Sequence, residues 1–218
     1  MIGMLEEIDI LLDEAEAGGG PDHQKRLAAR GKLPVRERIF NFLDPDSPFL
    51  EISGLAGYKS DYPVGGGAVA GIGVCSGIEC IIFANDPTVL AGAMHYYSVK
   101  KWMRSMAIAR DCRIPFIQFV ESAGGDLRPR GAMSAGAMGH FAESGRQFYE
   151  ITELSKLNIP TVTVTFGTAT AGGAYQPGMS DYNIFVKDQA DVALAGPPLV
   201  QMATGEISSR EDIGGAKM

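Results

Sequence analysis

Two short runs of small residues follow strand-like segments of this sequence and could do chemistry with their backbone alone. The first run is Ser122-Ala123-Gly124-Gly125, and the second is Ala171-Gly172-Gly173-Ala174. Small residues let a ligand atom come close to backbone N–H groups, and the start of a helix adds a partial positive charge. Such turns can hold a developing oxyanion, for example the enolate of a thioester. The alternative is that these glycines only allow tight turns or close packing.

Basic side chains gather near the first run, although the protein as a whole is acidic. The 218 residues carry 19 basic and 26 acidic side chains, a net charge of −7 at pH 7. This balance argues against a general nucleic-acid surface. Residues 100–130, in contrast, hold seven basic side chains against three acidic ones. A local positive field suits an anionic ligand that is steered to one place. For any single basic residue, a solvated helix face is the alternative.

Other reaction types find little support in the sequence. The three histidines, at positions 23, 95 and 140, are far apart and show no metal-ligand spacing, so no metal site is expected. The glycines at 71, 73 and 77 have the spacing GxGxxxG, which is not that of a dinucleotide-binding turn, and no phosphate-binding P-loop or GxSxG elbow is present. Cys75, Cys80 and Cys112 predict buried thiols in a reducing compartment.

The location of the protein is predicted from what its sequence lacks. No apolar stretch approaches the ~20 residues of a membrane helix, and the N-terminus does not have the pattern of a signal peptide. We therefore expect a cytoplasmic protein without membrane contact, or a mitochondrial matrix protein in a processed eukaryotic case.

Apolar periodicity predicts a helical N-terminal arm over residues 1–60. One helix is expected over residues 3–16, before three glycines, and another over residues 33–44 with Val35, Ile39, Phe40 and Leu43 on one face. The segment between them is polar and basic. The arm is expected to pack on something larger, and no residue of it indicates chemistry.

From residue 61 onward, short apolar runs alternate with helical patterns. Residues 68–74 and 78–84 predict a β-hairpin with its turn at 75–77, followed by a helix over 98–111 and a strand over 114–120. A helix over 136–157, a strand over 161–166 and two shorter strands at 183–187 and 191–195 complete the pattern. Strand, strand, helix in repetition predicts an α/β domain with a partly parallel sheet. The two glycine turns fall at the ends of strands 114–120 and 161–166.

Four blocks of the sequence resemble one known family in the same order. They are LAARGKLPVRERI, ANDPTVLAGAMHYYSVKK, TATAGGAYQPGMSDYNIFVK and LAGPPLV with QMATGEISSREDIGGAK. Together they resemble the N-terminal half of the carboxyltransferase (β) subunits of biotin-dependent acyl-CoA carboxylases, of the propionyl-CoA and 3-methylcrotonyl-CoA type. The likeness covers the chain from about residue 24.

The resemblance implies a crotonase-like ββα spiral for residues 61–218 and a binding site for acyl-CoA. It implies transfer of a carboxyl group from carboxybiotin to the α- (or vinylogous γ-) carbon of a short-chain acyl-CoA. The enolate would be held by backbone N–H groups of Ala171, Gly172, Gly173 and Ala174. The implied substrate-binding residues are Ser122, Ala123, Gly124 and Gly125 for the acyl pocket, Tyr175 beside it, and Lys100, Lys101 and Arg104 for the CoA phosphates.

The same resemblance implies partners. Biotin would be carried by a partner protein or domain, together with a biotin carboxylase, and a second carboxyltransferase domain would complete the enzyme. Family members continue beyond the block that ends here at Met218, so we expect the chain to be incomplete without that C-domain. The family implies dimers assembled into a hexamer, and no metal in this chain.

One departure from the family pattern keeps alternatives open. Many carboxyltransferases read Asp-Ser-Gly-Gly-Ala at the first turn, whereas residues 121–127 here are more similar to the turn of enoyl-CoA hydratases. A crotonase-type hydratase or decarboxylase, with Glu121 and Asp126 as acid–base groups, is the second hypothesis. A non-catalytic CoA-binding or assembly module is the third. The sequence does not predict which acyl group is preferred.

Overall fold

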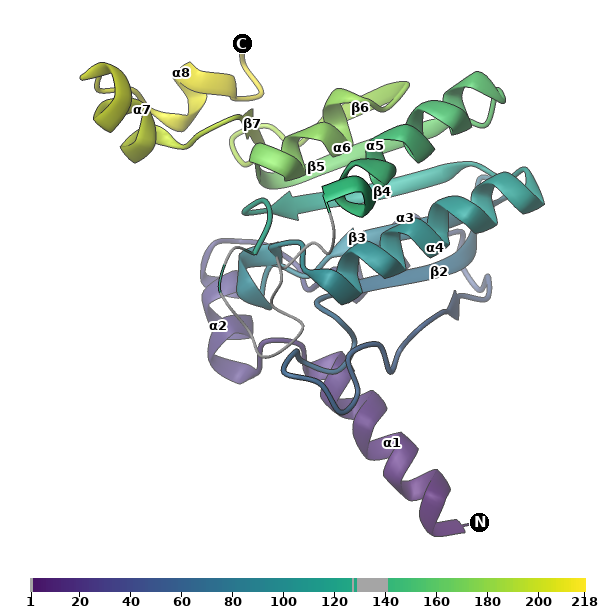
Figure 1. Cartoon of the computed structure of the whole chain (residues 1–218). Coiled ribbons are helices and arrows are strands. Elements are labelled where there is room, and N and C mark those ends of the chain that lie inside the picture. The colour runs from purple at the N-terminus through teal and green to yellow at the C-terminus, as the bar shows by residue number, and fades with distance from the viewer. Residues whose placement is uncertain (1, 127, 129–140) are drawn as a thin grey trace.

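The computed structural model describes residues 2–126, 128 and 141–218 of the chain. Within this part, one sheet of seven strands forms the centre of the molecule (Figure 1). Its spatial order is β1-β2-β3-β4-β5-β6, and β7 lies beside the last residues of β5. In chain order the strands are β1 (Leu50–Glu51), β2 (Ala68–Cys75), β3 (Ile78–Asn85), β4 (Phe116–Ser122), β5 (Thr161–Thr170), β6 (Tyr182–Phe185) and β7 (Asp191–Ala193).

Helices surround this sheet on several sides. Figure 1 shows α4 and α5 along the front of the sheet, α1 running away from it, and α7 and α8 at one end. The α-helices are α1 (Ile2–Ala17), α2 (Pro21–Ala29), α3 (Val35–Phe42), α4 (Tyr96–Cys112), α5 (Phe141–Lys156), α6 (Tyr175–Gly178), α7 (Pro197–Thr204) and α8 (Arg210–Gly214). Two short 3-10 helices are η1 (Leu90–Gly92) and η2 (Ala171–Ala174).

The predicted hairpin at residues 75–77 is confirmed. Strands β2 and β3 pair antiparallel from Ala68–Asn85 to Cys75–Ile78. Ser76 and Gly77 both have positive φ angles, of 52° and 75°, which is the backbone that a two-residue hairpin turn requires. The Asp44 carboxylate accepts hydrogen bonds from both backbone N–H groups, at 2.6 and 2.7 Å. The end of the arm therefore caps this turn.

The sheet is parallel from β3 to β7, and α4 and α5 are its crossovers. Strand β3 pairs parallel with β4, β4 with β5, and β5 with both β6 and β7. Parallel neighbours end at the same edge of a sheet, so the segments that follow β3, β4 and β5 must meet there. This topology places both glycine turns at one edge.

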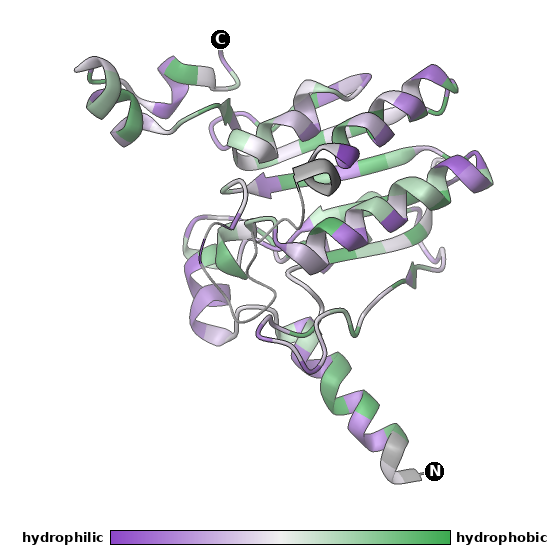
Figure 2. Ribbon diagram, in the orientation of Figure 1, coloured by the Kyte–Doolittle hydropathy of each residue, from purple (hydrophilic) through white to green (hydrophobic). Residues whose placement is uncertain are grey.

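Both faces of the sheet are buried. Ile81 of β3 lies in the cluster that includes Trp102 of α4 and Ile151 of α5. Its neighbour Ile82 lies in the cluster on the opposite face, with Ile39 of α3. Successive side chains of a strand point to opposite faces, so a strand buried on both sides is apolar throughout. The central strands are accordingly drawn mainly in the hydrophobic colour in Figure 2.

The arm differs from its prediction in two ways. Helix α2 forms where a merely polar segment was expected, because Pro21 at its first turn and good helix formers after it need little apolar periodicity. Figure 2 shows α2 mainly in hydrophilic colours, and its one buried residue among those described is Leu27. Phe40, predicted to face inward, is 59% exposed and contacts Phe49 edge-on. That prediction is wrong.

Two further predictions are corrected or only partly described. The helix predicted over 136–157 is present as α5, and its first five predicted residues lie outside the described part, as does the side chain of Phe141. Cys80 is buried as expected, and burial raises the pKa of its thiol to about 11. Cys112, at the end of α4, is exposed, so the prediction of a buried thiol is wrong there.

Candidate active site

The two glycine turns lie against each other at the carboxyl ends of β4 and β5. Gly173 has no room for a side chain, because a Cβ atom there would lie 2.9 Å from the Ser122 hydroxyl. Gly124 is equally close to the other turn, and its Cβ would lie 2.9 Å from the carbonyl oxygen of Thr170. The structure thus brings together two runs that stand 45 residues or more apart in the sequence.

The second turn leaves two backbone donors without an acceptor inside its own helix. In a 3-10 helix each N–H bonds the carbonyl three residues earlier, so the N–H groups of Ala171 and Gly172 have no acceptor within η2. Ala171 adopts a positive φ of 51°, which turns the chain sharply out of β5. No atom lies within 4 Å of the position of a Cβ on Gly172, so its Cα borders open space. A ligand oxygen can therefore approach this turn.

The first turn is different, because its donors are already engaged. The Ala123 N–H donates to the carbonyl of Ala91 at 3.1 Å, and the Gly124 N–H to the Ser122 hydroxyl at 3.2 Å. Gly125 pairs with Met94 as an isolated parallel bridge. Ala123 itself is exposed. The first turn therefore forms a wall of the site, and the second turn provides its open N–H groups.

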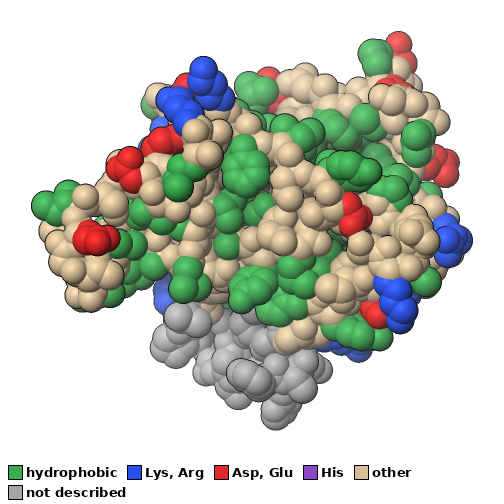
Figure 3. Space-filling view, turned by 90° about the horizontal axis from the view of Figure 1, so that it is seen from above, with side chains coloured by type: hydrophobic (Ala, Val, Ile, Leu, Met, Phe, Trp, Pro, Cys, Tyr) green, Lys and Arg blue, Asp and Glu red, His purple; other side chains and the backbone are tan. Residues whose placement is uncertain are grey.

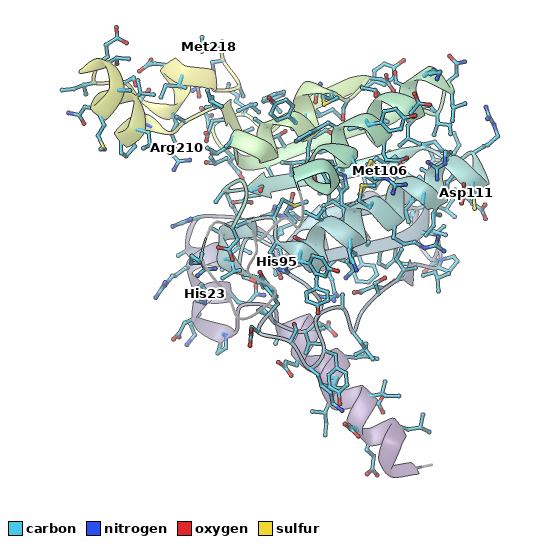
Figure 4. All side chains as sticks on the ribbon, in the orientation of Figure 1. His23, His95, Met106, Asp111, Arg210 and Met218 are labelled. Atoms are coloured by element: carbon cyan, nitrogen blue, oxygen red, sulfur yellow. The ribbon has the colours of Figure 1, made fainter. Side chains whose placement is uncertain are left out.

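A cavity of about 970 Å³ opens beside these turns. Its lining includes Ala123 of the first turn and Thr170, which directly precedes the second turn, while residues 171–174 themselves lie outside the lining. The loop after β3, from Pro87 to Ala91, forms one side. The arm and the C-terminal segment form the others, and Figure 4 shows His23 and Arg210, one from each, at the same end of the sheet. The volume suits a substantial organic ligand.

The basic residues predicted to bind phosphate do not line this cavity. Lys101 is 2% exposed, and its ammonium donates to the carbonyls of Gly65 and Ala68, at 3.1 and 2.6 Å. Burial lowers its pKa to about 8. The prediction for Lys101 is corrected, because a buried ammonium that holds two carbonyls cannot also reach a phosphate. Lys100 lies over the ring of Tyr96 at 4.4 Å, and Arg104 is exposed on α4.

Tyr175, predicted beside the acyl pocket, is the first residue of α6 and is 49% exposed. Its ring lies 4.6 Å from that of Phe148 on α5, measured between centroids. It is thus close in sequence to the second turn, and it does not line the cavity.

Glu121, at the end of β4, is held by two cations from the arm. Lys32 donates to its Oε1 at 2.6 Å, and Arg38 donates to its Oε2 at 3.0 Å. The side chains of Lys32 and Glu121 are each 12% exposed, and that of Arg38 is 5% exposed. Arg38 also lies over the ring of Phe166 at 4.9 Å. Both carboxylate oxygens are thus occupied by cations, and this geometry argues against Glu121 as the acid–base group. Asp126 is likewise paired with Arg128, at 2.8 Å.

A buried polar network anchors the helix that follows the second turn. Trp102 of α4 donates from its indole N–H to Gln118 of β4 at 2.8 Å, and Gln176 of α6 donates to the same oxygen at 3.3 Å. Gln118 in turn donates to Thr163 at 3.2 Å and to Ser180 at 3.1 Å. Gln118 and Gln176 are fully buried. The network therefore fixes α6 against β4 and β5, and with it the position of η2.

Sequence reasoning missed the contribution of the arm. Arg26, Arg30 and Lys32 line the cavity, and Arg38 reaches Glu121 beneath it. The signal was available, because residues 25–38 hold six basic side chains, and four of these fall in the first block that resembled the known family. It was passed over because no helix was expected between the predicted helices of the arm.

The described part of the chain shows neither a metal-binding group nor a membrane-spanning helix. No group of three or more His, Cys, Asp or Glu side chains among the described residues could hold a metal ion. None of the helices formed by these residues combines the length and apolar character needed to cross a membrane.

Curated proteins similar in sequence to this chain are named as carboxylase beta subunits or beta chains. The chain is 48% identical, over all of its length, to the probable biotin-dependent acyl-coenzyme A carboxylase beta2 subunit of Mycobacterium tuberculosis, and it covers 40% of that protein. The chain spans about two fifths of the length of the curated relatives it matches.

Two solved structures resemble the fold. The beta subunit of geranyl-CoA carboxylase from P. aeruginosa matches with a TM-score of 0.81 and 40% identity, over 99% of this chain and 38% of that one. The transcarboxylase 12S structure described as a hexamer with methylmalonyl-coenzyme A bound matches with a TM-score of 0.86 and 26% identity, over 100% and 42%. These likenesses confirm the predicted crotonase-like α/β fold.

The sequence also matches the model of a whole protein family. The sequence model of the family described as "Carboxyl transferase domain" matches residues 26–218, which is nearly the whole chain. On this match, and on the two adjoining glycine turns at its strand ends, the chain belongs to the carboxyl transferase domain family.

Proposed function

We propose that this chain is the acyl-CoA-binding half of a biotin-dependent carboxyltransferase. The observation that carries the proposal is the pair of glycine turns at adjoining strand ends beside a cavity of about 970 Å³. In this proposal the thioester carbonyl of a short-chain acyl-CoA lies against the open N–H groups at Ala171 and Gly172. Donors fixed in place stabilise negative charge that develops on the oxygen when the α-carbon loses its proton.

Each part of the site has a role in the proposal. Ser122, Ala123, Gly124 and Gly125 form the wall that faces the second turn, with Tyr175 at its border. Gly173 and Ala174 continue the 3-10 helix that holds the donors. Carboxybiotin on a partner carrier would supply the activated carboxyl group. This chain would bind and orient the thioester and stabilise the charge on its oxygen.

The hydratase or decarboxylase alternative receives less support. It needs a free carboxylate beside the first turn, and Glu121 and Asp126 are both engaged with cations. The named relatives and solved structures that match the chain are carboxylase subunits and a transcarboxylase. No specific observation favours the assembly-module alternative, which becomes an outcome of the test below.

The remaining parts of the enzyme are proposed from the relatives. The relative from Mycobacterium tuberculosis is about two and a half times as long as this chain. We therefore propose a C-domain, a biotin carboxylase and a biotin carrier as partners. We also propose that dimers assemble into a hexamer. We also propose that residues 1–60 act as an arm of the binding domain, residues 61–218. A cytoplasmic location, or a mitochondrial matrix location in a eukaryote, is part of the same proposal.

The test has a binding part and a turnover part. Titration calorimetry with acetyl-, propionyl-, 3-methylcrotonyl- and geranyl-CoA should show binding of at least one ester to the 218-residue chain. Addition of a C-domain from a relative and a carboxylated biotin carrier should then yield a carboxylated ester. A chain that assembles into oligomers but binds no ester would support the assembly module instead. Hydration of an unsaturated ester by the chain alone would support the hydratase.

A further inference from the structure

We propose that the arm, through Arg26 and Arg30, forms the subsite for the phosphate groups of the ligand. The inference rests on the proposed function, since it assigns one end of the same acyl-CoA site. It differs from the expectation for Lys100, Lys101 and Arg104, which lie on α4 outside the cavity.

Arg26 and Arg30 line the cavity that opens beside the glycine turns. Ala123 and Thr170 line it too. They stand four residues apart at the end of α2, so they share one face of that helix. Like charges at this spacing repel each other and destabilise a helix. An anion held between the two guanidinium groups would remove this repulsion.

Within the described part of the chain, these two arginines differ from the other cations around the cavity. Among the described residues, neither makes an ion pair, whereas Arg210 is paired with Asp191 at 3.3 Å. Arg210 is therefore largely neutralised by its neighbour. Arg26 and Arg30 are the cations of the lining that remain available to a ligand.

Lys32 continues the positive charge toward the glycine turns. Its ammonium is fixed by Glu121, 2.6 Å away, and Glu121 directly precedes Ser122 of the first turn. Because Arg38 also binds Glu121, the three side chains together carry a net positive charge. The cationic surface thus extends from α2 to the foot of the first turn. A ligand with a thioester at one end and phosphates at the other, such as an acyl-CoA, has this distribution of charge.

The helix dipole is the competing explanation. Cations are favoured in the last turn of any helix, because the carbonyl end carries a partial negative charge. This explanation accounts for Arg26 and Arg30 at the end of α2, but it predicts no effect of either residue on ligand binding.

The experiment compares two charge-matched double variants of the 218-residue chain. Arg26→Gln/Arg30→Gln removes the proposed subsite, and Lys100→Gln/Arg104→Gln removes two exposed cations from α4. Each protein is titrated by calorimetry with an acyl-CoA and with the matching acyl-pantetheine, which has the same thioester and no phosphate. Titrations at low and raised salt measure how strongly each affinity depends on charge.

The proposal expects Arg26→Gln/Arg30→Gln to weaken acyl-CoA binding by about tenfold or more, since hydrogen bonds to charged groups are lost. For the same variant it expects a flatter salt dependence of acyl-CoA affinity and an unchanged affinity for acyl-pantetheine. For Lys100→Gln/Arg104→Gln it expects no change in the affinity for either ligand.

Three results would overturn the proposal. If only the α4 variant loses the phosphate-dependent affinity, the subsite is on α4. If the arm variant weakens both ligands equally, the arginines act on the fold and not on phosphate. If it weakens neither, the dipole explanation stands, while acyl-CoA binding by the unaltered chain still supports the proposed function. An unaltered chain that binds no acyl-CoA would instead overturn the proposed function and this inference together.

Discussion

Glu121 shows why a carboxylate beside a glycine turn is not by itself an acid–base group. Its two oxygens are occupied by Lys32 and Arg38, and all three side chains are largely buried. From the sequence, Glu121 was a reasonable acid–base candidate, because nothing local indicates that residues some 85 positions earlier would neutralise it. Its position in the structure favours a structural role that ties the arm to the end of β4.

Replacement of this carboxylate should mainly cost stability. We expect Glu121→Gln to lower the free energy of unfolding by about 3 kcal/mol, because two buried cations lose their partner. Glu153→Gln, which breaks an exposed pair with Lys156, should cost less than about 1 kcal/mol. Denaturant unfolding measures both. An unfolding free energy for Glu121→Gln equal to that of the original chain, combined with loss of turnover, would return Glu121 to an acid–base role.

The packing of Gly173 against Ser122 gives a second prediction about a single residue. A methyl group there would lie 2.9 Å from Oγ and 3.0 Å from Cβ of Ser122, which is 1% exposed and cannot move aside. We expect Gly173→Ala to cost about 1–3 kcal/mol through overpacking and to push the two turns apart. Gly178→Ala is the matched control, since no atom lies within 4 Å of its Cβ position. Thermal unfolding of the two variants should separate them, and equal melting temperatures would contradict the packing of the turns.

At the scale of elements, α4 is anchored by Lys101 rather than only by its apolar face. The ammonium bonds two carbonyls of the segment that leads into β2, Gly65 and Ala68. Gly65, Gly66 and Gly67 all have positive φ angles, a backbone that glycine adopts most readily. The buried lysine therefore helps to fix this glycine segment against α4.

The low pKa of Lys101 predicts a pH dependence of stability. Its pKa is about 8 in the folded chain, against about 10.4 for an unfolded lysine. Between these values the unfolded state binds more protons, so this group adds stability as the pH rises. We expect the unfolding free energy of the original chain, relative to Lys101→Met, to increase by about 2 kcal/mol from pH 8 to pH 10.4. Denaturant titrations at several pH values measure this difference, and a constant difference would contradict the burial of the charge.

The elements that sequence patterns predicted are those whose signals are local. The hairpin turn at Ser76-Gly77, the apolar strands β4 and β5 and the amphipathic helix α4 were all found, because periodicity and turn chemistry are read within a dozen residues. Helix α2 was missed because it buries only Leu27 among its described residues. The placement of the glycine turns at strand ends was predicted, but their mutual contact depends on the parallel pairing of β4 and β5.

The positions of the cations also depend on tertiary packing and could not be predicted from local sequence. Lys101 carries the same charge as Lys100 next to it, and only tertiary packing makes one buried and the other exposed. Arg38 meets Glu121 through the docking of α3 on the sheet, a contact between distant parts of the chain. Charge density in a sequence therefore does not show which cations will face a cavity.

At the scale of the whole molecule, one end exposes many apolar side chains. Tyr182 and Ile184 of β6 are 65% and 55% exposed, and Leu199 and Met202 of α7 are 58% and 83% exposed. Figure 3, which views the molecule from above, shows hydrophobic side chains spread over this face. Within the described sheet β6 pairs only with β5, so its other edge is open. Surfaces of this kind are usually covered by another chain or domain.

This surface predicts protection in an assembled enzyme. If the proposed C-domain or a neighbouring subunit covers β6 and α7, their backbone N–H groups should exchange with deuterium more slowly in the assembly than in the 218-residue chain. Strand β3, buried in both cases, is the internal control. Hydrogen exchange followed by mass spectrometry measures all three segments, and unchanged exchange in β6 and α7 would place the partner elsewhere.

The proposed function depends most on hydrogen bonds from the backbone N–H groups of the second glycine turn to a thioester carbonyl. Isotope-edited infrared spectroscopy of an acyl-CoA labelled with ¹³C at that carbonyl tests this directly. Fixed donors should lower the stretching frequency of the bound carbonyl below its value in water, and Gly173→Ala should reduce that shift while Gly178→Ala preserves it. A bound thioester whose carbonyl frequency equals that in water would contradict the account.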